Sequence, residues 1–222
     1  RVLSGPARLA NGCVAFPVET PEDGACIGLS NGSICVVVAP ARRGQIMVMP
    51  ASASLAAVIA RADVALQPAE RCVARPGLAA ADDLPWQWRL DSHGALRLLS
   101  PPDRVHGVRW QRTIYLLRGE PVVRVATACK NIMQHTISWS AGTILTAARG
   151  AQAWSEPAAS RAVICTAADE LWAIAENPVH GYFPYDGVRV RSVTNTVPQR
   201  VTLFSEITPL DPDASFTHVQ YL

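Results

Sequence analysis

Apolar and polar side chains alternate along two neighbouring stretches in the middle of the chain. Residues 110–117 and 122–129 both have a period of two, which is the side-chain period of a β-strand. The turn-forming segment 118–121, with the sequence RGEP, lies between them. The alternation therefore predicts a β-hairpin in which one face of each arm looks into a core. On the first arm Trp110, Arg112, Ile114 and Leu116 share one face, and Gln111, Thr113, Tyr115 and Leu117 share the other. On the second arm the apolar stripe is Val123, Val125, Thr127 and Cys129.

Strand signals recur along most of the rest of the chain. The turn dipeptide Asn31-Gly32 precedes a run rich in β-branched residues, 33–39, that is short enough for a buried strand. Residues 51–66 have helical propensity, although an alanine-rich loop fits almost as well, and residues 67–85 are predicted to form a long irregular connection. The other predicted strands are 45–49, 136–145, 161–166, 170–175, 188–193, 200–207 and 216–222. Short strands with turns between them predict an all-β fold, an antiparallel sandwich or barrel.

Length and charge predict a single soluble domain. A chain of 222 residues falls in the size range of one all-β domain, and no shift in composition marks a boundary within residues 1–222. No apolar run reaches the roughly 18 residues needed to cross a bilayer. The formal net charge is +2, and the basic residues are scattered, with only Arg42 and Arg43 adjacent. We therefore expect no membrane span and no nucleic-acid partner.

The six cysteines have no CxxC spacing and no nearby histidine pair, so we expect no metal site. They are either small buried hydrophobic residues or disulfides of an exported protein, in which case Cys13 and Cys26 are the favoured pair. The chain also begins at Arg1 rather than at methionine, as it would after removal of a signal peptide. A periplasmic or secreted location is therefore expected, with the cytoplasm as the alternative.

Three segments share an order and spacing with a known group of proteins. The central one contains VRW, RGEPVVRVATACKN and TISWSAGTI, in which a strand closes on Asn131 and a tryptophan strand follows. The opening segment is NGSICVVVAPARRGQI, and the closing one is LFSEITPLDPDASFTHVQYL. Over roughly residues 31–49, 84–145 and 200–222 the chain resembles the galactose mutarotase-like superfamily, and most of all an uncharacterised bacterial branch of it. The resemblance implies an antiparallel two-sheet β-sandwich with a carbohydrate-facing groove.

The resemblance also implies a chemistry. Active aldose epimerases use a histidine as general acid on the ring oxygen and a glutamate as general base on the anomeric hydroxyl, because ring opening delivers one proton and removes another. The matching glutamate is Glu206, on the same strand face as Thr202 and Phe204, although a lone glutamate on a terminal strand is more often a solvated surface residue. The strand after the hairpin, ISWSAGTIL, has no histidine where active epimerases carry one. His180 is the candidate acid in its place.

Aromatic residues supply the candidate sugar-binding surfaces. Trp86 and Trp88 flank one polar residue at strand spacing and could form a stacking platform, although two core tryptophans are the commoner arrangement. Tyr182 and Tyr185 lie in the same segment as the candidate acid, NPVHGYFPYDG. Their rings could stack on a sugar, and the favoured alternative is a surface loop that closes one end of the sandwich. Arg112 completes the set of candidate substrate-binding residues.

The sequence contains no motif of a serine hydrolase, a P-loop, a zinc protease or a dinucleotide-binding site, and we expect no cofactor. The predicted function is the binding of a carbohydrate or polyol, with mutarotation or epimerisation by Glu206 as the enzymatic interpretation. The alternative is a non-catalytic glycan-binding or structural module. A third interpretation is a polysaccharide lyase or hydrolase on the same scaffold, which would use Arg109, Arg112 and Tyr115 on an acidic polymer.

Overall fold

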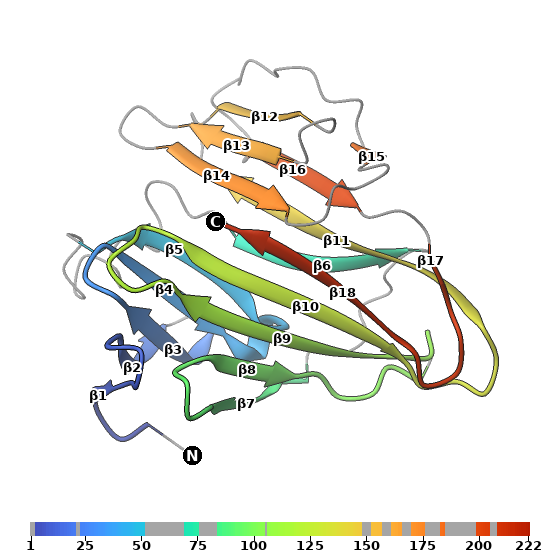
Figure 1. Ribbon diagram of the computed structural model, residues 1–222, viewed down its shortest axis with the longest axis horizontal. Coiled ribbons are helices and arrows are strands. Elements are labelled where there is room, and N and C mark those ends of the chain that lie inside the picture. The colour runs from blue at the N-terminus through green and yellow to red at the C-terminus, as the bar shows by residue number, and fades with distance from the viewer. Residues whose placement is uncertain are drawn as a thin grey trace.

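The computed structural model describes two large sheets of antiparallel strands, with no α-helix among the residues it describes (Figure 1). The predicted all-β sandwich is therefore confirmed. In residues 69–75 and 140–147, and in the strands between 152 and 204, the description is of the backbone and its pairing. The described residues are 3–20, 23–51, 69–75, 84–104, 106–147, 152–156, 161–165, 170–175, 183–184, 199–204 and 208–222.

Sheet A follows the strand order β1-β2-β3-β4-β5-β6-β11-β16-β15, and β17 pairs separately with β11. β4 shows why these residues form a sheet: its sequence ICVVVA is rich in β-branched residues, and all of it is buried. Gly32 has a φ of 90° in the turn before β4, a conformation that glycine adopts without strain. The strands are β1 (Ala7–Arg8), β2 (Val14–Thr20), β3 (Gly24–Ser30), β4 (Ile34–Ala39), β5 (Gln45–Pro50), β6 (Ala69–Arg75), β11 (Ile137–Ala147), β15 (Phe183–Pro184), β16 (Gln199–Phe204) and β17 (Thr208–Leu210).

Sheet B follows the order β12-β13-β14-β18-β10-β9-β8-β7. Short hairpins connect most neighbours, whereas β18, the last strand, inserts between β14 and β10. A 3₁₀ turn, η1 (Pro40–Arg42), lies between β4 and β5 of the other sheet. The strands of sheet B are β7 (Gln87–Leu90), β8 (Leu96–Leu99), β9 (Val108–Leu116), β10 (Val123–Asn131), β12 (Gln152–Glu156), β13 (Arg161–Cys165), β14 (Glu170–Ala175) and β18 (Ser215–Tyr221).

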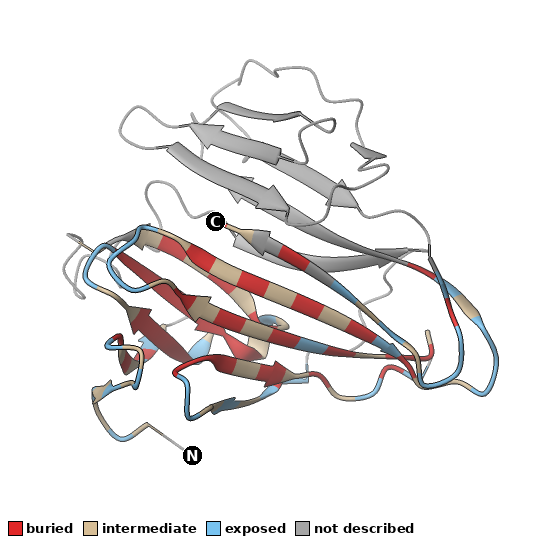
Figure 2. Ribbon diagram, in the orientation of Figure 1, coloured by how far each residue is buried: buried red, intermediate tan, exposed pale blue. Residues whose placement is uncertain are grey.

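The central hairpin forms as predicted from the alternation. β9 and β10 pair in register from Val123 opposite Leu116 to Asn131 opposite Val108. Buried residues alternate with partly or fully exposed ones along both strands, which is visible as bands in Figure 2. The buried face consists of Trp110, Arg112, Ile114 and Leu116 on β9 and of the predicted apolar stripe, Val123, Val125, Thr127 and Cys129, on β10. Period-two burial therefore governs this part of the sandwich.

The main core lies between the two sheets. Residues of β3, β4 and β5 pack there against residues of β8, β9 and β10. Fully enclosed side chains such as Leu29, Val36, Leu98 and Ile114 form its centre, and burial of aliphatic side chains is the main favourable term in such a core. The Trp110 and Trp139 rings meet at one end, 5.6 Å between centroids and tilted by 55°.

A second apolar cluster, which we call the outer cluster, lies on the opposite face of sheet A. Partly buried hydrophobic side chains of β2 and β5 pack against it. Its buried members are Val18, Cys26, Cys35, Val37 and Ala39. β3 and β4 are therefore buried on both faces, which explains their continuous apolar runs.

Two expectations from the sequence are wrong. Residues 67–85 are not wholly irregular, because β6 pairs with both β5 and β11; the charged residues of its sequence, AERCVAR, hide the strand pattern. The disulfide between Cys13 and Cys26 is absent, because both thiols are free. Cys13 packs between the sheets whereas Cys26 belongs to the outer cluster, so the sheet backbone separates them. The possible helix at 51–66, beyond its first residue, and the predicted strand at 188–193 lie outside the described residues.

Candidate functional site

β11 is the strand on which the candidate site is built, because it pairs with three other strands. One of its edges pairs with β6, in a register that places Ser140 opposite Arg75. The other edge pairs with β16, with Gly142 opposite Phe204, and its first residues pair with β17. Strands from three distant parts of the sequence, namely β6, β11 and the neighbouring β16 and β17, therefore lie side by side in sheet A (Figure 1).

Glu206, the candidate base, lies outside the described residues, between β16 and β17. The residues that flank this segment, Phe204 and Thr208, pair with Gly142 and Trp139 of β11. The sequence predicted one strand over 200–207, whereas the structure has two strands in different registers. Trp139 lies three residues before Gly142 on β11, whereas Thr208 lies four residues after Phe204. The pairing register on β11 therefore shifts by one residue between β16 and β17. Both ends of the segment that carries the candidate base are thus fixed to β11.

β15 brings a second candidate segment to the same end of β16. Phe183 pairs with Phe204, and the next pair joins Pro184 to Leu203. His180, Tyr182 and Tyr185 themselves lie outside the described residues, but they flank this short strand in the chain. The pairing therefore places β15, which these residues flank in the chain, next to β16, the strand that precedes Glu206.

The buried Asn131 fixes where β11 begins. Its side-chain amide donates to the carbonyl oxygens of His135 and Leu210, at 2.9 and 2.8 Å, and its side-chain oxygen accepts from the Met133 amide at 2.8 Å. These bonds hold the turn from β10 to β11 and attach it to the end of β17. Loop residues positioned by buried amides in this way keep a defined geometry. The sequence signal was the asparagine that closes the second arm of the hairpin.

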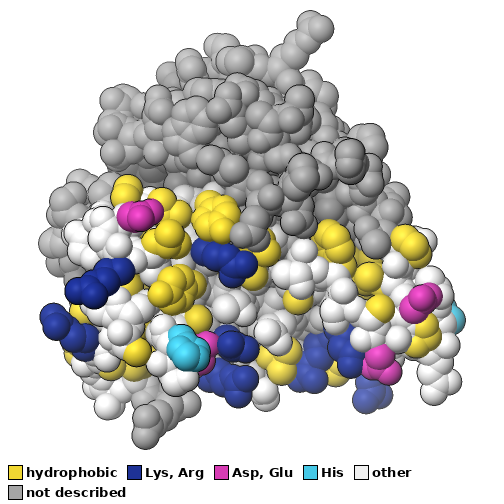
Figure 3. All heavy atoms as spheres, in the orientation of Figure 1, with side chains coloured by type: hydrophobic (Ala, Val, Ile, Leu, Met, Phe, Trp, Pro, Cys, Tyr) yellow, Lys and Arg dark blue, Asp and Glu magenta, His cyan; other side chains and the backbone are white. Residues whose placement is uncertain are grey.

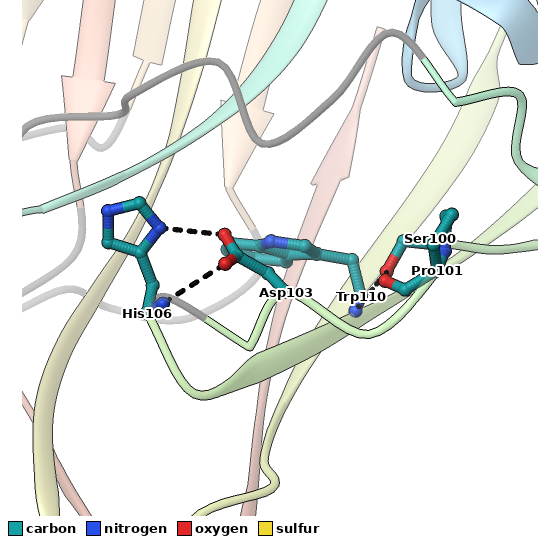
Figure 4. A network of polar contacts seen from close by, with 5 residues as sticks. All are labelled: Ser100, Pro101, Asp103, His106 and Trp110. Carbon is teal, nitrogen blue, oxygen red and sulfur yellow. Dashed lines mark hydrogen bonds and ion pairs between the residues drawn. The ribbon is translucent and has the colours of Figure 1, made fainter.

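The loop after β8 is held by a small polar network (Figure 4). Asp103 accepts from the His106 backbone amide at 3.0 Å and contacts the ring Nδ1 of His106 at 2.7 Å. Ser100 Oγ accepts from the Trp110 amide at 2.9 Å and donates to the Pro101 carbonyl at 2.7 Å. The hydroxyl is engaged with backbone groups, so the network acts as a structural clasp for the loop.

Trp86 and Arg112 lie together in the interior around Gly44. A Cβ atom built on Gly44 would lie 3.4 Å from the Trp86 ring and 3.5 Å from Cδ of Arg112. Arg112 is fully enclosed, and among its contacts it donates to the Gly44 carbonyl at 2.7 Å and to Thr127 Oγ1 at 3.3 Å. Trp88 is partly buried against the same inter-sheet core. These placements match the alternative in which both tryptophans are core residues, and they give Arg112 a position inside the sandwich.

The candidate residues therefore fall into two groups. β7, which follows Trp86 and contains Trp88, is an edge strand of sheet B, whereas β15 and β16 end sheet A. Figure 1 shows β7 and β15 at opposite ends of the molecule. The structure does not bring Trp86, Trp88 or Arg112 together with β15, and a ligand-binding role for them remains a prediction.

Other chemistry is sparse in the described residues. No group of three or more His, Cys, Asp or Glu side chains in the described part of the chain could hold a metal ion. Burial raises the pKa of the Cys26 and Cys35 thiols to about 11, so these thiols are protonated and poorly nucleophilic near neutral pH.

On the face drawn in Figure 3 the basic side chains are interspersed with apolar and acidic ones. No helix in the described ranges is long and apolar enough to cross a membrane.

Solved structures with the same fold include proteins named for sugar chemistry. An Escherichia coli K12 protein assigned as an aldose 1-epimerase superposes with a TM-score of 0.57 and 11% identity, over 95% of this chain and 98% of that one. A galactose mutarotase-like protein of Clostridium acetobutylicum gives a TM-score of 0.61 and 9% identity, over 93% and 96% of the two chains. The chain therefore has the galactose mutarotase-like fold.

The fold also occurs as part of a longer protein. A TPR-domain containing protein of Parabacteroides distasonis superposes with a TM-score of 0.59 and 10% identity, over 89% of this chain and 46% of that one. No family model matches the sequence. No curated protein matches it either. Fold similarity at such low sequence identity establishes the architecture alone.

Proposed function

We propose that the protein binds a sugar at the end of sheet A formed by β11, β16 and β15 and interconverts its anomers. The observation that carries the proposal is the pairing of β15 with the end of β16, two residues before Glu206. The segments of Glu206, His180, Tyr182 and Tyr185 all border this pair of strands. A base, an acid and two aromatic rings within one region are the groups that mutarotation needs.

The proposed reaction uses Glu206 as the base and His180 as the acid. The glutamate carboxylate removes the proton of the anomeric hydroxyl, the C1–O1 bond becomes a carbonyl, and the bond from C1 to the ring oxygen breaks. The protonated histidine delivers its proton to the ring oxygen, which becomes a hydroxyl. Rotation about the C1–C2 bond followed by the reverse steps closes the other anomer and restores both side chains. Tyr182 and Tyr185 would stack on the apolar face of the sugar ring.

The fold supports this proposal, because proteins assigned as an aldose 1-epimerase and as galactose mutarotase-like share it over nearly their whole length. The absence of histidine from the sequence of β11 requires the acid to come from another segment. The segment that precedes β15 contains His180, and β15 pairs with β16. This requirement makes His180 a specific and testable choice.

The test is the exchange rate between α and β anomers of glucose and galactose, measured by NMR exchange spectroscopy with the full chain. We expect catalysed exchange that Glu206→Gln reduces by about 100-fold or more, and that His180→Gln also reduces strongly. The matched control is Glu120→Gln, since Glu120 is an exposed carboxylate in the turn between β9 and β10. Exchange at the uncatalysed rate with every sugar, or equal activity of Glu206→Gln and Glu120→Gln, would contradict the proposal.

The second candidate is a non-catalytic glycan-binding module. It is favoured by the absence of histidine from β11 and by the occurrence of the fold within a TPR-domain containing protein about twice as long as the matched region. It predicts saturable binding of a sugar, seen by calorimetry, with no acceleration of anomer exchange. The lyase or hydrolase interpretation is weaker, because Arg112 is enclosed and Arg109 donates to the Ser100 carbonyl at 3.1 Å.

A further inference from the structure

The outer face of sheet B, directed away from sheet A, is a surface that the proposed sugar site does not use. Arg112, Ile114 and Val125 point into the sandwich, so the alternate residues of β9 and β10 belong to the outer face. The pairing registers extend this face to β7, β8 and β18. Figure 3 looks onto it, because β9 and β10 lie in front of β5 in Figure 1, which has the same orientation.

The charged side chains at the described outward positions of these five strands are all cationic. They are Arg89, Arg97, Arg109, Arg124 and Lys130. Carboxylates that contact this face come from the turns at its border. An excess of one sign of charge on one face creates a potential that attracts the opposite sign.

Four of the five cations form two cation pairs in directly opposite positions of neighbouring strands. Arg89 of β7 pairs with Arg97 of β8. Arg109 of β9 pairs with Lys130 of β10. Like charges opposite each other in a sheet are destabilising, so neither cation pair benefits the fold by itself. An anion bound at each pair would offset that repulsion.

The turn carboxylates neutralise only part of this charge. Asp91 contacts Arg97 at 3.0 Å, and Asp213 contacts Lys130 at 2.7 Å. The Arg97 and Lys130 side chains are nevertheless 40% and 47% exposed. Arg109 donates through Nε to the Ser100 carbonyl, which holds its side chain in place, and a guanidinium has further N–H donors. The face therefore offers exposed charge and a positioned donor.

Neutral polar side chains separate the two cation pairs. Thr113 pairs with Arg97, and Gln111 lies between Thr113 and Arg109 on the same face of β9. The partly exposed Tyr115 follows on that face, where its ring can contact the apolar side of a sugar. With strands about 4.8 Å apart and about 3.3 Å per residue, the centres of the two cation pairs lie roughly 16 Å apart. This pattern fits a ligand with two separated anionic groups and hydroxyls between them.

We infer that the outer face of sheet B binds a linear acidic polysaccharide in which carboxylates are separated by neutral sugar units. One carboxylate lies at each cation pair, and Gln111 and Thr113 bond to the hydroxyls between. Guanidinium groups bind carboxylates through paired, charge-assisted hydrogen bonds. Nucleic acid fits less well, because a phosphate at every nucleotide calls for clustered cations. Unlike the lyase interpretation, this binding requires no cleavage of the polymer.

Isothermal titration calorimetry with the full chain tests the inference. The probe is a hyaluronan oligosaccharide, in which glucuronate alternates with a neutral sugar. The same oligosaccharide with its carboxylates reduced to alcohols is the neutral comparison. We expect the acidic form to bind about tenfold more tightly or better. Arg89→Gln and Lys130→Gln should each weaken it about threefold or more, and together about tenfold or more.

The matched control is Arg8→Gln, which removes an exposed arginine from sheet A and so changes the net charge equally. Arg89→Lys retains the charge and should keep most of the affinity. Because like charges repel within each cation pair and the Lys130–Asp213 pair is exposed, neither Arg89→Gln nor Lys130→Gln should lower the melting temperature without ligand.

Three results would overturn the inference. The first is equal affinity for the acidic and the reduced oligosaccharide. The second is an equal loss of affinity in Arg8→Gln and in the Arg89→Gln, Lys130→Gln protein. The third is tighter binding of a thymidine oligonucleotide of similar length, which would assign the face to nucleic acid.

The inference is independent of the proposed anomer exchange. The Arg89→Gln, Lys130→Gln protein should exchange glucose anomers at the parental rate, and Glu206→Gln protein should bind the acidic oligosaccharide with parental affinity. Loss of oligosaccharide binding in Glu206→Gln, with no effect of the two outer-face substitutions, would place the polymer elsewhere and overturn the inference.

Discussion

Asn131 donates its side-chain amide to the carbonyl oxygen of Leu210 at 2.8 Å, across 79 positions of the chain. This bond joins the end of β10 in one sheet to the strand that follows Glu206 in the other. The side-chain amide also donates to the His135 carbonyl, and the side-chain oxygen accepts from the Met133 amide, so one enclosed side chain binds three backbone groups.

Replacement of Asn131 by alanine should therefore be costly. We expect Asn131→Ala to lower the free energy of unfolding by about 3 kcal/mol, because it leaves several buried backbone groups without partners. Urea denaturation followed by circular dichroism measures the change. The control is Thr136→Val, which removes an exposed bond to Asp211 nearby and should cost no more than about 0.5 kcal/mol. Similar small losses in both variants would contradict the assigned role.

Arg112 is expected to matter for stability and not for ligand affinity. Arg112→Ala opens a cavity between the sheets and removes the bond to the Gly44 carbonyl, so the free energy of unfolding should fall by about 3 kcal/mol or more. Sugar affinity, measured by calorimetry below the melting temperature, should match that of the parent protein. A variant that folds with parental stability but no longer binds a sugar would contradict this expectation and would show that Arg112 is a ligand-binding residue.

Gly28 and Phe16 form a cross-strand pair in which the ring covers the glycine. A Cβ atom at Gly28 would collide with that ring, so Gly28→Ala should destabilise the protein by about 1–3 kcal/mol. In a Phe16→Ala background the same change should be nearly neutral. A double-mutant cycle in urea measures the coupling, which should exceed about 1 kcal/mol. Additive effects of the two substitutions would show that the ring does not pack on the glycine.

The buried thiols predict a loss of stability at alkaline pH. Burial raises the pKa of Cys26 and Cys35 from 9.0 to about 11 in the folded protein, so folding favours the neutral thiols. Their contribution is complete below pH 9 and is lost as the pH rises through the folded value near 11. The free energy of unfolding of the parent should fall across this window, and the Cys26→Ala, Cys35→Ala protein should show a smaller fall. Identical pH profiles would contradict the thiol origin.

Thiol accessibility gives a second measurement on the same residues. Cys13, Cys26, Cys35 and Cys129 are all buried, and none of these four thiols forms a disulfide. A thiol reagent such as 5,5′-dithiobis(2-nitrobenzoic acid) should therefore react slowly with these four cysteines at neutral pH and rapidly after denaturation. Mass spectrometry of peptides identifies which cysteines have reacted. Rapid native labelling of Cys35 would show that the outer cluster opens easily.

The sequence predicted the parts of the fold in which one face is buried and the other is not. β9 and β10 follow that rule, so their alternation specified the hairpin and, on β10, the core face. β6 does not: its charged residues obscure the alternation, and pairing with strands on both sides stabilises it. Cys26 shows the same difficulty, since a buried face on the outside of sheet A could not be distinguished from the inter-sheet core by pattern alone.

The candidate site was predictable in part for a related reason. Glu206 was found from its position near the end of the chain, and the backbone places its flanking strands on β11. Trp86 and Trp88 were grouped with it on residue type. Residue type does not report which end of a sheet a strand occupies, and β7 lies at the other end of the molecule from β15 (Figure 1).

The most direct test is to map a bound sugar by hydrogen–deuterium exchange with mass spectrometry, using saturating glucose or galactose. We expect protection to appear in peptides covering β11, β15 and β16, the strands of the proposed sugar site. Protection confined to β7 and β8, beside Trp86 and Trp88, would contradict the account.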